Sequence, residues 1–90
     1  MENGNRKLVQ HLNYNMHAQQ VGVMNIFEKD GALVAQLAVF DPRTMQQSKV
    51  MVGADDTFDV GGQRYRVVQL AAAQGDERAW LEIAPDPQLH

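Results

Sequence analysis

A tight-turn signal between two long apolar stretches constrains the fold of this chain most strongly. Residues 21–28 and 32–40 are rich in apolar side chains, and Lys29-Asp30-Gly31 separates them. Asp-Gly tolerates the positive φ angles of a two-residue turn, so the sequence predicts an antiparallel hairpin with Asp30-Gly31 as its loop. The predicted cross-strand pairs are Lys29–Ala32, Glu28–Leu33, Phe27–Val34, Ile26–Ala35, Asn25–Gln36, Met24–Leu37 and Val23–Ala38.

Both faces of this predicted hairpin are apolar, because side chains alternate between the two faces of a strand. One face carries Phe27, Val34, Val23 and Phe40, and the other carries Ile26, Met24, Leu37, Leu33 and Val39. An antiparallel sheet with one solvated face alternates apolar and polar residues. We therefore expect another layer, the N-terminal segment or a partner subunit to cover the second face.

A second hairpin is predicted around Gly61-Gly62, between residues 57–60 and 63–70. Its predicted pairs are Val60–Gln63, Asp59–Arg64, Phe58–Tyr65 and Thr57–Arg66. This register places an aromatic pair on one face and an opposite-charge pair on the other, each worth about 0.2–1 kcal/mol. A phosphate-binding loop requires a third spaced glycine and a following helix, or a Lys-Ser or Lys-Thr pair. The two glycines are therefore interpreted as a turn.

The return strand of this hairpin changes the face on which its apolar residues lie. Tyr65 and Val67 share one face, whereas Val68 and Leu70 fall on the other. This change predicts a β-bulge near Val67-Val68, or a bend that carries the strand from one layer to another.

The remaining segments are predicted from their turn residues and apolar spacing. Residues 71–78 form a polar connection, and 79–83 form a last strand with Leu81 and Ile83 on one face and Trp80 on the other. Asp41-Pro42 predicts an N-capped helical turn through about residue 47, with a plain turn as the alternative, followed by an edge strand at 49–52.

The first twenty residues fit two structures. Leu8, Leu12 and Met16 recur at helical spacing, but together with Tyr14 they also fit strand alternation, which we favour. The predicted fold is therefore mainly β, a single-domain antiparallel sandwich or partly open barrel built from hairpins. The alternative is an α+β fold, with the sheet covered by one N-terminal helix. We expect one domain over 1–90, with flexible ends at 1–6 and 85–90.

Composition limits the classes of function. The chain has 8 Lys and Arg against 11 Asp and Glu, a net charge of −3, so no nucleic-acid partner is expected. The absence of cysteine excludes disulfides, a thiol nucleophile and cysteine-ligated metals. The N-terminal residues do not resemble a secretion signal, and no apolar run approaches the roughly 20 residues of a membrane helix. We expect a soluble, cytoplasmic protein without membrane association.

The polar residues do not form a recognisable catalytic or metal-binding pattern. His11 and His17 are six residues apart, which does not suit a helical ligand pair. The acidic stretch 55–59 lacks the alternating ligands of a calcium loop, and Ser48 lacks the glycines of a nucleophile elbow. The sequence therefore predicts no catalytic residue, no metal and no cofactor, and a protein that is not an enzyme.

Protein–protein interaction is the function that the sequence favours. The hairpin with two apolar faces and the five methionines, which adapt to varied surfaces, indicate a contact surface. Homodimerisation is the simplest use of it, and a heterologous protein is the other partner considered. The predicted interface residues are Met24, Ile26, Leu37 and Val39.

A small-ligand-binding or regulatory β-barrel domain is the alternative function. Its pocket is predicted in the mouth of the barrel, where a few polar groups orient a ligand against apolar walls. The predicted pocket residues are Tyr65, Trp80, Asn25 and Gln36.

The segment DDTFDVGGQRYRVVQL, followed by AWLEI, resembles the closing portion of small bacteriophage head–tail adaptor proteins. In that family a Gly-Asp-x-apolar stretch, a glycine turn, a Tyr-x-Val strand and a final Leu-Glu-Ile strand recur. The resemblance covers 55–83, and the expected Gly-Asp start is here Gly53-Ala54-Asp55-Asp56. It implies a structural protein that acts through interactions alone.

Overall fold

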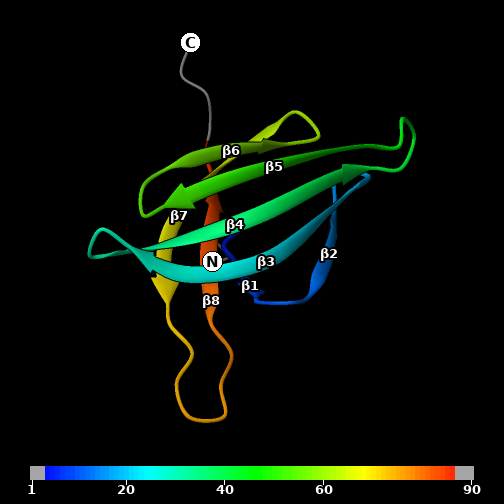
Figure 1. The fold of residues 1–90 in the computed structure, drawn as a ribbon. Helices are drawn as coiled ribbons and strands as arrows, with labels where there is room; N and C mark the ends of the chain where they lie inside the picture. Colours follow the sequence, from blue (N-terminus) through cyan, green and yellow to red (C-terminus); the bar gives the residue numbers. More distant parts are fainter. Residues whose placement is uncertain (1–3, 87–90) are drawn as a thin grey trace.

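The computed structural model describes residues 4–86, which form two four-stranded antiparallel sheets (Figure 1). The strands are β1 (Arg6–Val9), β2 (Asn13–Met16), β3 (Gln19–Lys29), β4 (Ala32–Asp41), β5 (Gln46–Gly53), β6 (Thr57–Val60), β7 (Gln63–Ala71) and β8 (Trp80–Pro85). The front sheet has the order β2-β3-β4-β5, and the back sheet has the order β1-β8-β7-β6. The predicted β sandwich is confirmed, and the alternative with an N-terminal helix is wrong because both early segments are strands.

Within each sheet, strands that are consecutive in the chain pair with one another, and β8 also pairs with β1. The chain changes sheets at the connections β1–β2 and β5–β6. In Figure 1, β3, β4 and β5 of the front sheet run across the view, while β8 and the lower part of β7 run up and down behind them. The two layers therefore cross steeply, as in orthogonally packed sheets.

The predicted first hairpin is confirmed near its turn and wrong in register beyond Asn25. Pairing follows the prediction from Lys29–Ala32 to Asn25–Gln36, and then shifts so that Val23 pairs with Leu37. Met24 is the extra residue of a β-bulge, which has no counterpart on β4. The predicted pairs Met24–Leu37 and Val23–Ala38 are therefore not formed.

This bulge also changes which side chains face the core. With one residue added, Val21 and Val23 point to the same side as Ile26, and all three are buried. The prediction that Val23 shares a face with Phe27 is therefore wrong. Met24 is 40% exposed instead of lying beside Leu37.

The irregularity predicted in β7 is confirmed as a bulge. Pairing with β8 passes from Val67–Ile83 to Gln69–Glu82, so Val68 is the extra residue. As a result, Leu70 packs against the same core as the buried Val67. In Figure 1, β7 also bends here from the direction of β6 to that of β8.

The second hairpin has the predicted register throughout, from Val60–Gln63 to Thr57–Arg66. Gly61 and Gly62 have φ angles of +56° and +89°, which confirms the turn. The rings of Phe58 and Tyr65 stack with centroids 6.0 Å apart on the inner face.

The segment after β4 is a plain turn, so the predicted helical turn through residue 47 is wrong. The Asp41 carboxylate accepts the Arg43 N–H at 3.0 Å, as a helix cap would, but the Asp41 carbonyl accepts the Met45 N–H at 2.8 Å and closes a hairpin. Met45 has a φ of +61°, which reverses the chain direction. β5 consequently begins at Gln46 and includes the predicted edge strand at 49–52.

The core lies between the sheets, and its buried residues are apolar side chains from all eight strands and the residue before β8. They are Leu8, Met16, Val21, Val23, Ile26, Ala35, Leu37, Val52, Phe58, Val60, Tyr65, Val67, Ala79, Leu81 and Ile83. Trp80 is half-buried on the opposite side from Leu81 and Ile83, as predicted. The flexible ends predicted at 1–6 and 85–90 fall partly on 1–3 and 87–90, which lie outside the described residues. Arg6 and Pro85 belong to β1 and β8.

The turns β2–β3 and β6–β7 meet at one end of the sandwich and join the sheets. His17 Nε2 and the Tyr65 hydroxyl are hydrogen-bonded at 2.6 Å, and the Gly61 N–H donates to Gln19 Oε1 at 3.0 Å. His17 and Ala18 both have positive φ, which forms a tight turn without glycine.

This contact predicts different effects of alanine at the two glycines of the β6–β7 turn. A Cβ at residue 61 would lie 2.7 Å from the His17 carbonyl oxygen, whereas one at residue 62 would meet no described residue within 4 Å. Gly62→Ala should lower the free energy of unfolding by about 1 kcal/mol through backbone strain alone. Gly61→Ala should lower it by about 2–4 kcal/mol, since overpacking adds to the strain. Urea unfolding of both variants measures the difference, and equal losses would contradict the packing of the two turns.

Candidate functional site

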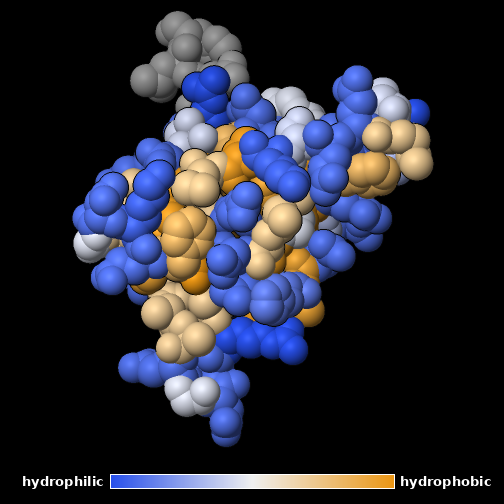
Figure 2. Space-filling model, in the orientation of Figure 1, coloured by the Kyte–Doolittle hydropathy of each residue, from blue (hydrophilic) through white to orange (hydrophobic). Residues whose placement is uncertain are grey.

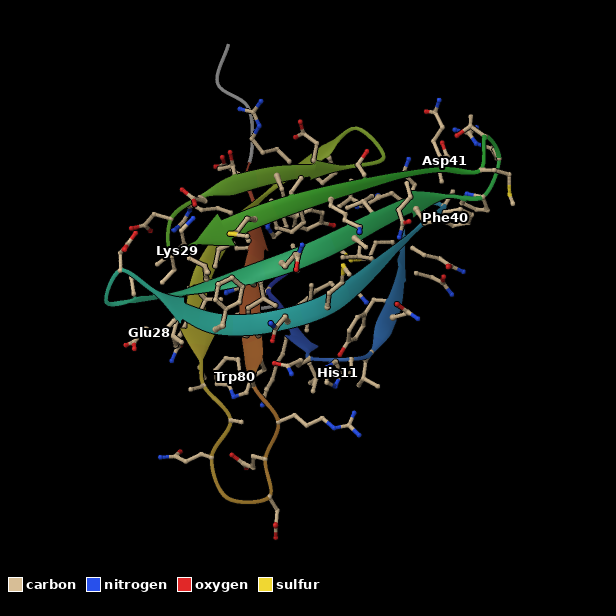
Figure 3. The ribbon with its side chains drawn as sticks, in the orientation of Figure 1. His11, Glu28, Lys29, Phe40, Asp41 and Trp80 are labelled. Carbon is tan, nitrogen blue, oxygen red and sulfur yellow. The ribbon has the colours of Figure 1, made fainter. Side chains whose placement is uncertain are left out.

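The front sheet has a solvent-facing side that no other layer covers among residues 4–86. We call it the outer face, and the strand registers assign its residues. They are Asn13, Asn15, Gln20, Gly22, Asn25, Phe27, Lys29, Ala32, Val34, Gln36, Ala38, Phe40, Gln47, Lys49, Met51 and Gly53. Figure 3 shows its central hairpin extending from Glu28 and Lys29 at one end to Phe40 and Asp41 at the other.

The outer face differs in charge from the rest of the chain. It contains no aspartate or glutamate, although the chain as a whole has a net charge of −3. Its two lysines lie at the periphery, Lys29 beside the hairpin turn and Lys49 on the edge strand β5. The two central strands carry neutral groups on this face, including the side-chain amides of Gln20, Asn25 and Gln36, and the edge strands add those of Asn13, Asn15 and Gln47. The centre of this face is therefore uncharged and rich in groups that both donate and accept hydrogen bonds.

Apolar side chains gather at the hairpin-turn end of the outer face. Phe27 and Val34 form a cross-strand pair and are half-buried, and Met51 is 47% exposed on the neighbouring strand. Figure 2 shows apolar side chains exposed among polar ones on this side of the molecule. A solvated sheet face normally carries polar residues, so this end has the composition of a contact surface.

The other end of the outer face contains a hollow of about 440 Å³. It is lined by His11, Asn13, Gly22, Val23, Met24, Ala38 and Gln47. Its floor is low because Gly22 and Ala38, two of the smallest residues, pair across β3 and β4. A Cβ at residue 22 would collide with Asn13 Oδ1, so the position of the Asn13 amide requires glycine there.

The four residues predicted as an interface do not share one surface. Leu37 and Ile26 are 0% and 8% exposed in the core, and Val39 packs against the core. Met24 alone is exposed, because the bulge moves it out of the alternating pattern. The partly exposed apolar side chains at the turn end of the outer face are instead Phe27, Val34 and Met51, which the sequence placed on the other face or did not single out.

The residues predicted for a ligand pocket are not brought together either. Tyr65 is buried between the sheets, whereas Asn25 and Gln36 pair on the outer face of the front sheet. Trp80 lies on the outside of the back sheet, where Lys7 Nζ is 4.5 Å from its ring centroid. The hollow was not found from the sequence, because its residues come from separate strands and the β1–β2 connection.

The acidic stretch 55–59 is organised by local contacts. Asp55 lies 3.5 Å from Arg66, Asp59 lies 3.5 Å from Arg64, and the Asp56 carboxylate accepts the Gly53 N–H at 2.8 Å. Within 4–86, no three His, Cys, Asp or Glu side chains are close enough to hold a metal ion. The same range contains no helix long and apolar enough to cross a membrane.

No protein-family model, curated protein or solved structure matches this chain. The segment that resembles phage head–tail adaptor proteins corresponds to β6, β7 and β8. The candidate site, on the front sheet, lies outside that segment.

The assignment of core and surface on the central hairpin predicts opposite results for two alanine variants. Leu37→Ala should lower the free energy of unfolding by about 2–5 kcal/mol, because it leaves a cavity in the core. Met24→Ala should change it by less than about 0.5 kcal/mol, as expected for a surface position. Thermal and urea unfolding measure both values. A large loss for Met24→Ala would place that side chain in the core and contradict the bulge.

Proposed function

We propose that this protein is a non-enzymatic interaction module, and that the outer face of its front sheet is the surface through which it binds a second copy of itself. The observation that carries this proposal is the composition of that face, which combines exposed apolar side chains with an uncharged, amide-rich centre. Interfaces are depleted of charge at their centre and place charged groups at the rim. Lys29 and Lys49 have this peripheral position.

A second copy is the partner that this chemistry suits best. A twofold interface brings the same surface from both chains together, so the surface has to complement itself. Side-chain amides meet this requirement, because each one donates and accepts hydrogen bonds. Phe27, Val34 and Met51 would bury apolar area in both copies at once. A face with carboxylates at its centre would repel itself, and the outer face has none.

Solution mass tests this proposal. Light scattering across a concentration series should show wild-type protein moving from monomer to dimer mass. Met51→Asp should remain monomeric, because a twofold contact would bury a carboxylate from each copy without a partner. Met51 is 47% exposed, so circular dichroism should show that the variant stays folded.

Met45→Asp is the matched control. Met45 is 74% exposed in the β4–β5 turn, away from the centre of the outer face. It should dimerise like wild type if the interface is specific. A wild-type protein that is monomeric at every concentration would overturn the proposal. Equal loss of dimer in both variants would indicate unspecific association through exposed methionines.

A further inference from the structure

The hollow on the outer face has a rim residue whose side chain is oriented by a chain of hydrogen bonds. Near the β3 bulge, the Ile26 N–H donates to Gln10 Oε1 at 3.2 Å. Because a backbone N–H can only donate, this bond fixes which end of the Gln10 amide is oxygen. The Gln10 nitrogen therefore faces His11 Nε2, at 3.2 Å.

The tautomer of neutral His11 follows from this contact. An amide nitrogen only donates, so His11 Nε2 accepts, and the ring proton lies on Nδ1. His11 thus offers an N–H donor that the Gln10 bond leaves unused. Figure 3 shows His11 in the connection beneath β3.

The backbone of His11 is held in a conformation that favours glycine. Its φ is +72°, and its N–H donates to the Val23 carbonyl at 2.7 Å. A side chain in this region costs about 1 kcal/mol or more, and such residues concentrate at functional sites. Here the strained residue, the bulge at Met24 and the hollow occur together.

We propose that this hollow binds an uncharged sugar unit, with His11, Asn13 and Gln47 forming hydrogen bonds to its hydroxyl groups. Asn13, Gln47 and the neutral form of His11 supply donors and acceptors without charge, which suits hydroxyls that also do both. Gly22 and Ala38 provide a low floor for the C–H face of a sugar ring, where the Ala38 methyl group supplies the apolar contact. The volume of about 440 Å³ lies within the range of about 300–1,000 Å³ for small-molecule sites.

A charged ligand fits these residues less well. Among residues 4–86 the lining contains no arginine, lysine or carboxylate, so a charge placed in the hollow would lose hydration without gaining an ion pair. Lys49 pairs with Ala38 but does not line the hollow. Inorganic phosphate is therefore the probe that tests the neutral assignment.

The hollow lies on the same outer face as the proposed dimer contact, and Asn13 and Gln47 belong to both, so a second copy would compete with the ligand. Sugar binding is therefore tested in the Met51→Asp variant, in which the hollow stays open. If this variant binds no sugar while the wild-type protein dimerises, this inference alone falls, and sugar binding without a wild-type dimer removes the dimer alone.

The experiment is a titration of the monomeric Met51→Asp protein, as the full chain, with glucose, galactose, mannose and N-acetylglucosamine, each in turn, followed by backbone amide NMR. At least one sugar should give saturable shifts at His11, Gly22, Met24 and Ala38. Inorganic phosphate should give none there. Saturable shifts with phosphate alone, no saturable shift with any sugar, or shifts confined to other residues would each overturn the proposal.

Two variants, each made with and without Met51→Asp, separate binding from folding. Ala38→Leu fills the hollow from the solvent side and should abolish the shifts. His11→Gly removes the donor and relieves the backbone strain, so binding should weaken about fivefold to tenfold, as for one lost hydrogen bond, while the thermal midpoint stays or rises. Gln74→Ala, which removes an exposed amide in the β7–β8 hairpin, is the control and should bind like wild type. Unchanged sugar binding by Ala38→Leu would place the ligand elsewhere.

Discussion

The packing of the two sheets depends on one extra residue in each of two long strands. In β3 the inward side chains are at positions 21, 23 and 26, and in β7 they are at 65, 67 and 70. Both strands thus change from a spacing of two residues to a spacing of three, because Met24 and Val68 are bulged. Without these bulges, half of each strand would direct its apolar residues to solvent. The bulges also increase local twist, which suits sheets that cross steeply.

The bulge in β7 could be predicted from the sequence, whereas the bulge in β3 could not, for a physical reason. Simple alternation from Val67 would bring Gln69 into the core. Because a polar residue is unfavourable there, the sequence itself indicates that the alternation is interrupted. In β3, alternation from Ile26 brings Met24 inward, which is an acceptable core residue. The pattern therefore agreed with an uninterrupted register. The hairpins themselves were predictable because Asp30-Gly31 and Gly61-Gly62 specify their turns locally. The turn after Asp41 was less predictable, since its cap also begins helices.

The candidate site was predictable only in its composition. An unusual content of amides is visible in the sequence, but their meeting on one face depends on pairing between β2, β3, β4 and β5. A hollow arises where Gly22 lies beside Ala38, and this pair forms only after the bulge shifts the register. The strained His11 lies in a connection whose conformation is set by contacts with Val23 and Gln10. Such contacts leave no periodic signal.

The pairing of β1 with β8 has a consequence for how the chain acquires its structure. All other paired strands follow one another in the chain, but this ladder joins the first described strand to the last. The Asn5 side chain also donates a hydrogen bond to Glu82 at 2.8 Å. During synthesis, β1 leaves the ribosome long before its partner exists. Leu8, which is buried in the folded protein, cannot form its pair with Leu81 until that residue has been synthesised. The back sheet can therefore be completed only after β8 has emerged, whereas the front sheet pairs strands that follow one another directly in the chain.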